Sequence, residues 1–263
     1  MRLITLTTDF GWQDWFAGTM KGVILSINPD GRVVDLTHGI PAGDIRAGAF
    51  ALMAGYKFFP AGTIHVAVID PGVGSARAAI VVETHQYFFI GPDNGVLSFA
   101  LKNETIRTVR RIENNALFAG PLSRTFHGRD LFAPVAAHLS TGVPLGKVGP
   151  KVSSFVELDF PSVAIRENGM SGEVIYIDAF GNALTNIPES LRGDIPSLLH
   201  KLTVMLPSQR MVPVCDCYQS VPKGKAVAVF GSTGFLEIAV HGGNAARSLR
   251  LKIGSRIWIR SNE

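Results

Sequence analysis

The chain has 263 residues, of which 46% are hydrophobic and 17% charged, with a formal net charge of +4. This length and apolar content suffice for a sizeable core in one large or two modest domains. The basic residues are scattered rather than gathered in a run with aromatic residues, which argues against a nucleic-acid groove. The apolar runs are too short to cross a bilayer, and the N-terminus lacks a signal-like apolar segment. We therefore expect a soluble, cytoplasmic protein with no nucleic-acid or membrane partner.

The first part of the chain alternates predicted strands and helices. Apolar runs predict strands at residues 3–8, 32–36, 63–69, 79–83 and 87–90. Apolar residues at helical spacing predict helices at residues 15–27, 44–56 and 132–139. This alternation argues for an α/β domain with a mostly parallel sheet covered by helices.

From about residue 152 the pattern changes to short extended segments separated by turns. These segments are 172–177, 201–206, 226–230, 235–240 and 256–259. Their spacing predicts a small antiparallel barrel or sandwich. We place the domain boundary between residues 155 and 156, giving domains at 1–155 and 156–263.

Cys215 and Cys217 are the two cysteines of the chain. They are too few for a metal site, and no histidine or cysteine cluster stands beside them in the sequence. We expect two free thiols, as is usual in a reducing cytoplasm.

A polar turn follows the apolar run at residues 63–69. Asp70 stands at the end of that predicted strand, where open α/β sheets place their ligands. A proline and two glycines up to Gly74 predict a tight loop, and Arg77 brings a positive charge back towards Asp70. Taken alone, this turn is more often a structural Asp–Arg pair than a site.

Similar turns follow other predicted elements. Asp9 follows the first strand, Asn94 follows the strand at 87–90, and His127 stands between a loop and a helix start. Several strand ends that carry acids, an amide and a histidine indicate one shared cleft.

Six motifs in this order resemble those of the S-adenosyl-L-methionine hydroxide adenosyltransferase family, also called S-adenosylmethionine hydrolases, which are relatives of fluorinases and chlorinases. The motifs are Asp9–Gly11, Asp70–Gly74 with Arg77, Gly91–Gly95, Phe126–Asp130, Asp178–Asn182 with Asn186, and Gly231–Ala239. The resemblance covers nearly the whole chain. It implies an N-terminal α/β domain that binds a nucleoside and a C-terminal β-barrel that completes the site. It also implies a homotrimer with the ligand between subunits.

The implied reaction is hydrolysis of S-adenosyl-L-methionine to adenosine and L-methionine by attack of water on the ribose 5′ carbon, with no cofactor or metal. Asp70, Arg77 and His127 match the catalytic triad of the family. A histidine, with an ordinary pKa of about 6.5, can accept a proton from water. Arg77 can stabilise a hydroxide-like nucleophile, and Asp70 can orient either partner.

The same resemblance implies a set of substrate-binding residues: Asp9, Asp178, Phe180, Asn182, Ser232, Thr233, Glu237 and Val240. Asp9 matches the acid that binds the ribose hydroxyls, although it could also cap a helix. Asp178 is expected at the substrate ammonium, Asn182 at the adenine, and Ser232 with Thr233 at the methionine carboxylate. Glu237 could equally face solvent by strand alternation.

Two alternatives stay open at this point. One is a halogenase that acts on the same substrate; Gly128 argues against it, because the fluorinase has a serine there and Gly128 offers no side chain to a halide. His127 likewise stands where the fluorinase has a tyrosine. The other is a non-catalytic protein that binds adenosine or S-adenosylmethionine. The intact triad argues against a pure binder.

Overall fold

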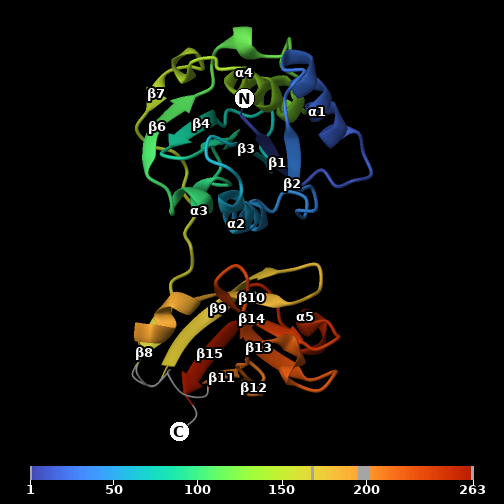
Figure 1. Cartoon of the computed structure of the whole chain (residues 1–263), viewed down its shortest axis with the longest axis vertical. Helices are drawn as coiled ribbons and strands as arrows, with labels where there is room; N and C mark the ends of the chain where they lie inside the picture. Colours follow the sequence, from blue (N-terminus) through green and yellow to red (C-terminus); the bar gives the residue numbers. More distant parts are fainter. Residues whose placement is uncertain (1, 167–168, 195–201, 262–263) are drawn as a thin grey trace. The chain divides into compact units, whose positions relative to one another are not determined.

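The structure is a computed structural model that describes residues 2–166, 169–194 and 202–261 (Figure 1). The chain divides into two compact units, Met1–Leu158 and Asp159–Glu263. Each unit has a hydrophobic core of its own. The two units are described separately below. The strand predicted at 201–206 includes Lys201, which lies outside the described residues.

The strands of the first unit form a sheet in the order β2-β1-β3-β5-β4-β6-β7. They are β1 (Ile4–Thr8), β2 (Val33–Thr37), β3 (Ile64–Val68), β4 (Ala79–Thr84), β5 (Phe88–Pro92), β6 (Ile106–Arg111) and β7 (Lys151–Val152). Neighbours among β2, β1, β3 and β5 run parallel, which confirms the predicted α/β domain. The strands β4, β6 and β7 extend the sheet with antiparallel pairs.

The lengths of the connections explain this mixture. The helices α1 (Phe16–Ile27) and α2 (Ile45–Gly55) lie between β1, β2 and β3, and such crossovers allow parallel pairing. Between β4 and β5 only residues 85–87 intervene, too few for a crossover, so these strands form a hairpin. The Thr84 amide donates to the Tyr87 carbonyl at 2.9 Å and closes that hairpin.

Helices cover both faces of this sheet. Figure 1 shows α1 and α4 (Ala133–Ser140) on one side of the strands and α2 with α3 (Ser98–Leu101) on the other. All residues of β3 are buried, and its alternate side chains enter different layers. Ile64 and Val66 join the core with α1, whereas His65 stacks on Phe89 at 5.2 Å between ring centres. With both faces covered, the strand ends are the part of the sheet left for a ligand.

The second unit is an antiparallel, nearly closed barrel, as predicted. Its strands are β8 (Ala164–Arg166), β9 (Gly169–Ile177), β10 (Ala183–Pro188), β11 (Leu202–Met205), β12 (Met211–Pro213), β13 (Ala226–Phe230), β14 (Phe235–Val240) and β15 (Arg256–Ser261). They follow the order β12-β11-β15-β9-β10-β14-β13, and β8 pairs with β9. Val214 bridges to Ala228, and the Cys215 amide donates to the Ala228 carbonyl at 2.9 Å. These contacts bring the two end strands of the sheet together.

Other expectations concern the membrane and the thiols. Within the described ranges, none of the helices combines the length and the apolar character that a membrane span needs. Cys215 and Cys217 are both free, as predicted. The Cys217 sulfur lies 3.4 Å from the Ser220 hydroxyl.

Candidate active site

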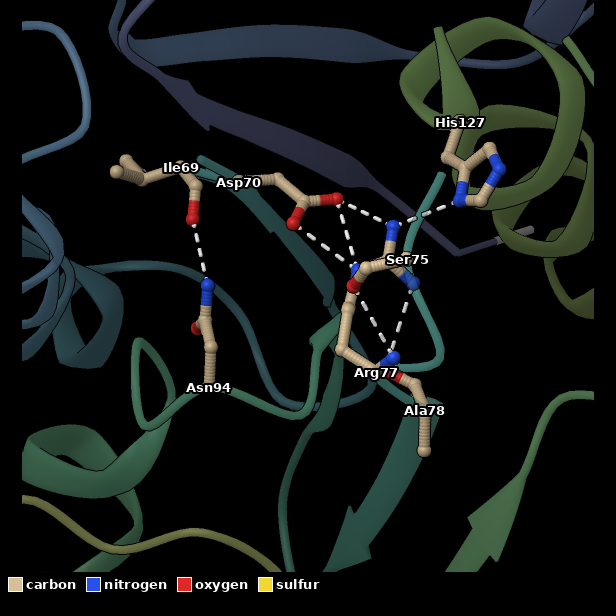
Figure 2. Close-up of polar contacts among 7 residues, drawn as sticks. All are labelled: Ile69, Asp70, Ser75, Arg77, Ala78, Asn94 and His127. Atoms are coloured by element: carbon tan, nitrogen blue, oxygen red, sulfur yellow. Dashed lines mark hydrogen bonds and ion pairs between the residues drawn. The ribbon is translucent and has the colours of Figure 1, made fainter. Parts of the chain in front are cut away.

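The end of β3 is held in place by a neighbouring loop. Asp70 follows β3 after Ile69, and the Asn94 side-chain amide donates to the Ile69 carbonyl at 2.8 Å (Figure 2). Asn94 comes from the loop after β5, the parallel neighbour of β3. Sequence reasoning singled out the Asn94 turn without giving this side chain a role. The structure shows that it anchors the residue before Asp70.

One glycine allows the Asp70 loop to approach the segment that leads to His127. Gly74 has a φ of +77°, a conformation that side chains with a Cβ rarely adopt. A Cβ at this position would lie 2.2 Å from the Arg124 carbonyl oxygen. Gly74 therefore permits a contact between two segments that are distant in the sequence.

Arg77 joins Asp70 and His127 into one cluster (Figure 2). Its Nε donates to both Asp70 carboxylate oxygens at 3.0 Å, and its terminal nitrogen Nη2 also donates to Oδ2. The same Nη2 lies 2.7 Å from His127 Nδ1. The side chains of Arg77 and Asp70 are only 12% and 5% exposed, so these charge-assisted bonds are shielded from water.

The environment of His127 favours the neutral ring. Burial lowers the pKa of His127 below its usual value, and the positive charge of Arg77 lowers it further. The negative charges of Asp70 and Asp130 act in the opposite direction but do not reverse the shift. A neutral imidazole near pH 7 has a lone pair that can accept a proton.

Asp9 follows β1 and faces the same region. Its Oδ2 accepts a hydrogen bond from the Gly43 amide at 2.8 Å. Burial raises the pKa of the Asp9 carboxyl, and the nearby charge of Asp70 raises it further. Asp9 is not a helix cap, because α1 starts at Phe16 and is preceded by Trp15.

A cavity of about 290 Å³ lies among these groups. Its lining consists of Asp9, Phe10, Phe16, Val68, Asp70, Val73, Thr125, Phe126, His127 and Gly128. The rings of Phe10, Phe16 and Phe126 contact one another with centroids 5.1–5.8 Å apart. The cavity thus combines two carboxylates and an imidazole with an apolar aromatic cluster. This combination suits a ligand with a polar and an apolar part.

Gly128 lies where this cavity meets the aromatic cluster. A Cβ here would be 3.1 Å from Met20 Sδ and 3.1 Å from Phe126 Cε2. The surrounding side chains therefore occupy the space that a larger residue would need.

Among the described residues, no group of three or more histidine, cysteine, aspartate or glutamate side chains is arranged to hold a metal ion. The positive charge at the triad comes from Arg77.

In the second unit, Asp178 holds the turn between β9 and β10. Its Oδ1 accepts from the backbone amides of Phe180 at 2.9 Å and Asn182 at 2.8 Å, and its Oδ2 accepts from Asn182 Nδ2 at 3.1 Å. The Asn182 side chain is buried, whereas the Phe180 ring is 78% exposed. The turn therefore presents an aromatic side chain to the exterior of this unit.

Glu237 on β14 is buried and does not face solvent, the alternative that strand alternation had left open. It is 6% exposed, and the Tyr218 hydroxyl donates to its Oε1 at 2.6 Å. Burial raises the pKa of Glu237, and the charge of Asp178 raises it further. Sequence reasoning missed Tyr218, because a single tyrosine in a loop carries no periodic signal.

The remaining predicted residues of this unit lie directly before β14 or at its end. Ser232 and Thr233 form the turn between β13 and β14, and Val240 is buried at the end of β14. The Thr233 hydroxyl is buried in this unit.

Comparison with known proteins places these features in a family. The model of the SAM hydroxide adenosyltransferase N-terminal domain matches residues 4–149, and that of the C-terminal domain matches residues 172–258. Among solved structures, an uncharacterised conserved protein from Thermotoga maritima is 36% identical with a TM-score of 0.91, covering 98% of this chain and 100% of that chain.

Curated relatives carry two kinds of names. The (R)-S-adenosyl-L-methionine hydrolase of Salinispora tropica is 38% identical over 259 residues, which is 97% of each chain. The protein of the same name from Thermus thermophilus is also 38% identical, over 97% of this chain and 98% of its own. The fluorinase of Nocardia brasiliensis is 27% identical over 98% of this chain and 96% of its own.

Proposed function

This chain belongs to the SAM hydroxide adenosyltransferase family, and on that premise we propose that the cavity of its first unit is the reaction centre of an S-adenosyl-L-methionine hydrolase. The enzyme converts S-adenosyl-L-methionine and water to adenosine and L-methionine; relatives at 34–38% identity are named (R)-S-adenosyl-L-methionine hydrolase. The observation that carries the site assignment is the position of Arg77, which is bonded to both Asp70 and His127 beside the cavity.

The reaction is a displacement at the ribose 5′ carbon. The water oxygen forms a bond to this carbon while the carbon–sulfur bond breaks. The electron pair of the broken bond stays on sulfur and neutralises the sulfonium. Since the leaving group is already cationic, the enzyme needs an oriented water and a proton acceptor rather than a strong acid. Methionine leaves as a neutral thioether, and adenosine keeps the new 5′ hydroxyl.

Each triad residue has a role that fits its contacts. Arg77 holds the attacking oxygen and stabilises the negative charge that develops on it. Asp70 fixes the guanidinium by accepting its hydrogen bonds. In the structure, Arg77 donates to His127 Nδ1. During the reaction the attacking water replaces Arg77 as this donor, and Nδ1 accepts the proton of the water. His127 later releases that proton to solvent.

We assign the remaining predicted residues to substrate binding. Asp9 accepts hydrogen bonds from the ribose hydroxyls, a role suited to a carboxylate whose second oxygen is fixed by Gly43. The second unit contributes Asp178, Phe180, Asn182, Ser232, Thr233, Glu237 and Val240 to the adenine and methionine parts. Asp178 acts through the turn that it holds, because its oxygens already accept bonds from Phe180 and Asn182.

Water is the nucleophile that the cavity favours over a halide. Gly128 offers no side chain to bind an anion, and Met20 and Phe126 leave little room for a larger side chain at this position. The imidazole of His127 supplies a proton acceptor, which water needs and a halide does not. No cofactor takes part in the proposed reaction.

We further propose three properties that follow from the family. The preferred substrate is the epimer with R configuration at sulfur, the form named for the relatives from Salinispora and Thermus. The enzyme is a cytoplasmic homotrimer with its sites between subunits. Light scattering of the purified protein measures the mass of the particle, and a monomer at micromolar concentration would contradict the trimer.

A single assay tests the function. The purified protein is incubated with a mixture of both sulfonium epimers in ¹⁸O-labelled water, with and without chloride or fluoride, and the products are separated by chromatography. We expect adenosine with the label at its 5′ oxygen, equal amounts of methionine, no dependence on halide and faster loss of the R epimer. His127→Ala is the inactive variant, and His85→Ala, which changes an exposed histidine, is the matched control.

Three results would contradict the proposal. A 5′-halogenated nucleoside would identify a halogenase. Unlabelled adenosine would mean that water does not attack the 5′ carbon. Binding of substrate without turnover would leave a protein that binds the nucleoside only.

A further inference from the structure

Asp130 is a buried carboxylate that the proposed reaction does not use. It is 4% exposed and lies in the π-helical turn Gly128–Phe132, which begins directly after His127 and continues into α4. Such turns widen the helix by one residue and are frequent at functional sites. Its negative charge lies close enough to His127 to influence the ring.

The Asp130 carboxylate fixes the loop before His127. Its Oδ2 accepts from the Ser123 backbone amide at 2.8 Å. Arg129 donates to both oxygens, from Nε at 2.5 Å and from a terminal nitrogen at 3.1 Å. The Arg129 guanidinium also lies over the Phe126 ring, 5.3 Å from its centre. Asp130 thus ties the residues on both sides of His127 together.

Arg77 fixes the tautomer of the neutral His127 ring. Its terminal nitrogen lies 2.7 Å from His127 Nδ1. Since a guanidinium has donors only, Nδ1 is the acceptor, and the proton of the neutral ring is on Nε2.

From this chain of contacts we propose that Asp130 is a positioning residue, which fixes the loop at Ser123 and the turn after His127, so that the ring keeps Nδ1 as the acceptor towards Arg77 and the attacking water and carries its proton on Nε2. The proposal rests on the proposed function only in that it names water as the nucleophile. The tautomer itself follows from the contact between Arg77 and Nδ1.

Asp130 also balances the charge around the ring. The charged groups that act on His127 are Arg77 and Asp70 from the loop after β3 and Asp130 on the turn that follows the ring, where Arg129 is paired with Asp130. Arg77 disfavours the imidazolium, whereas Asp130 and Asp70 favour it. Replacing Asp130 by a neutral residue therefore lowers the pKa of His127.

The first experiment measures the tautomer in the unaltered protein. Nitrogen chemical shifts of ¹⁵N-histidine-labelled enzyme distinguish a nitrogen that carries a proton from one that does not, and His127→Gln identifies the signals. We expect His127 Nε2 to be protonated and Nδ1 to be bare at neutral pH. The opposite tautomer would overturn the proposal without any Asp130 variant.

The second experiment uses Asp130→Asn, which removes the charge at nearly constant shape. We expect kcat to fall about 10- to 100-fold, as when the partner that orients a reacting histidine is lost, with KM changed much less. Because the base works in its neutral form, the acidic limb of the kcat/KM profile should move to lower pH. The nitrogen shifts should show a mixture of tautomers.

Asp30→Asn is the matched control. It makes the same charge change at an exposed position between α1 and β2, at the opposite end of the strands from Asp70, and should leave the rate and the limb unchanged. An Asp130→Asn enzyme whose acidic limb and tautomer equal those of the unaltered enzyme would limit Asp130 to a structural role. If the protein fails to hydrolyse the substrate at all, the proposed function fails, but the nitrogen shifts still decide the tautomer.

Discussion

The terminal nitrogen of Arg77 lies 2.7 Å from His127 Nδ1. Since a guanidinium has no acceptor, Arg77 donates and Nδ1 is the unprotonated nitrogen. The same Arg77 carries bonds to Asp70, so one cation orients a carboxylate and an imidazole at once. A planar group with several fixed donors can do this, whereas an ammonium cannot hold both partners in the same geometry.

Arg77→Gln should therefore change both the rate and its pH dependence. We expect a loss of kcat of about 10²- to 10³-fold, the size typical for removing a group that stabilises developing negative charge. Because the charge of Arg77 lowers the pKa of His127, its loss raises that pKa. The acidic limb of kcat/KM should then move to higher pH, opposite to the shift predicted for Asp130→Asn. A limb that stays in place would mean that His127 is not the titrating base.

His127→Ala should separate turnover from binding. Loss of a general base costs about 10²- to 10⁴-fold in kcat. Adenosine affinity should change little, because the ring is assigned to the nucleophile and not to the nucleoside. Single-turnover kinetics and calorimetry with adenosine measure the two quantities. Full activity in this variant would remove His127 from the mechanism.

Asp9→Asn should weaken binding and at the same time stabilise the fold. Loss of a charged hydrogen-bond partner of the ribose should raise KM about tenfold or more, with kcat nearly kept. Burial raises the pKa of Asp9, so the ionised carboxylate costs folding free energy at neutral pH, and the amide avoids this cost. Because its pKa is raised, Asp9 is protonated at a higher pH than an ordinary aspartate. On acidification, substrate binding should therefore start to weaken at that higher pH. Titration of KM against pH and thermal unfolding test both effects, and an unchanged KM would exclude the ribose role.

Gly128→Ala should destabilise the first unit. The added methyl group meets Met20 and Phe126 at 3.1 Å, closer than ordinary contact. Because Met20 is flexible and can move, we expect a cost of only about 1 kcal/mol. Gly22→Ala is the matched control: it lies on the exposed side of α1 with no atom near its Cβ, and should gain about 0.5–1 kcal/mol of stability. If denaturant titrations showed the same change in unfolding free energy for Gly128→Ala and Gly22→Ala, the cavity wall would be loosely packed.

His65 makes stability depend on pH. Burial lowers the pKa of His65 to about 3, so the folded protein keeps the ring neutral while the unfolded chain binds a proton below about pH 6.5. The stability from this group is complete above pH 6.5 and declines as the pH falls towards 3. At pH 5 the loss should be about 2 kcal/mol.

His65→Asn should remove that part of the pH dependence while keeping a polar partner for Thr5, which lies 2.8 Å from His65 Nδ1. The difference in unfolding free energy between the two proteins, measured from pH 7 to pH 5, isolates this residue from other titrating groups. A constant difference over this range would contradict the assignment.

Much of the fold was readable along the chain. The runs of β1 and β3 predicted strands because strands covered on both faces are rich in apolar and β-branched residues. The pairing of β4 was less evident: its run looks like those of the parallel strands, and only the three-residue connection 85–87 reveals a hairpin. The short strand β10 was not predicted, because Ala183–Pro188 contains too little β-branched or alternating pattern.

The residue types and their order along the chain already indicated the chemistry that we propose. Asp9, Asp70 and Arg77 stand in turns after predicted strands and His127 at a predicted helix start, and these residue types suit proton transfer and charge stabilisation around a small ligand. Tertiary structure alone decided their state: which nitrogen of His127 faces Arg77, that Glu237 is buried against Tyr218, and that Asn94 and Asp130 act as supports. The physical reason is that protonation and orientation depend on burial and on partners tens of residues away, and a linear pattern encodes neither.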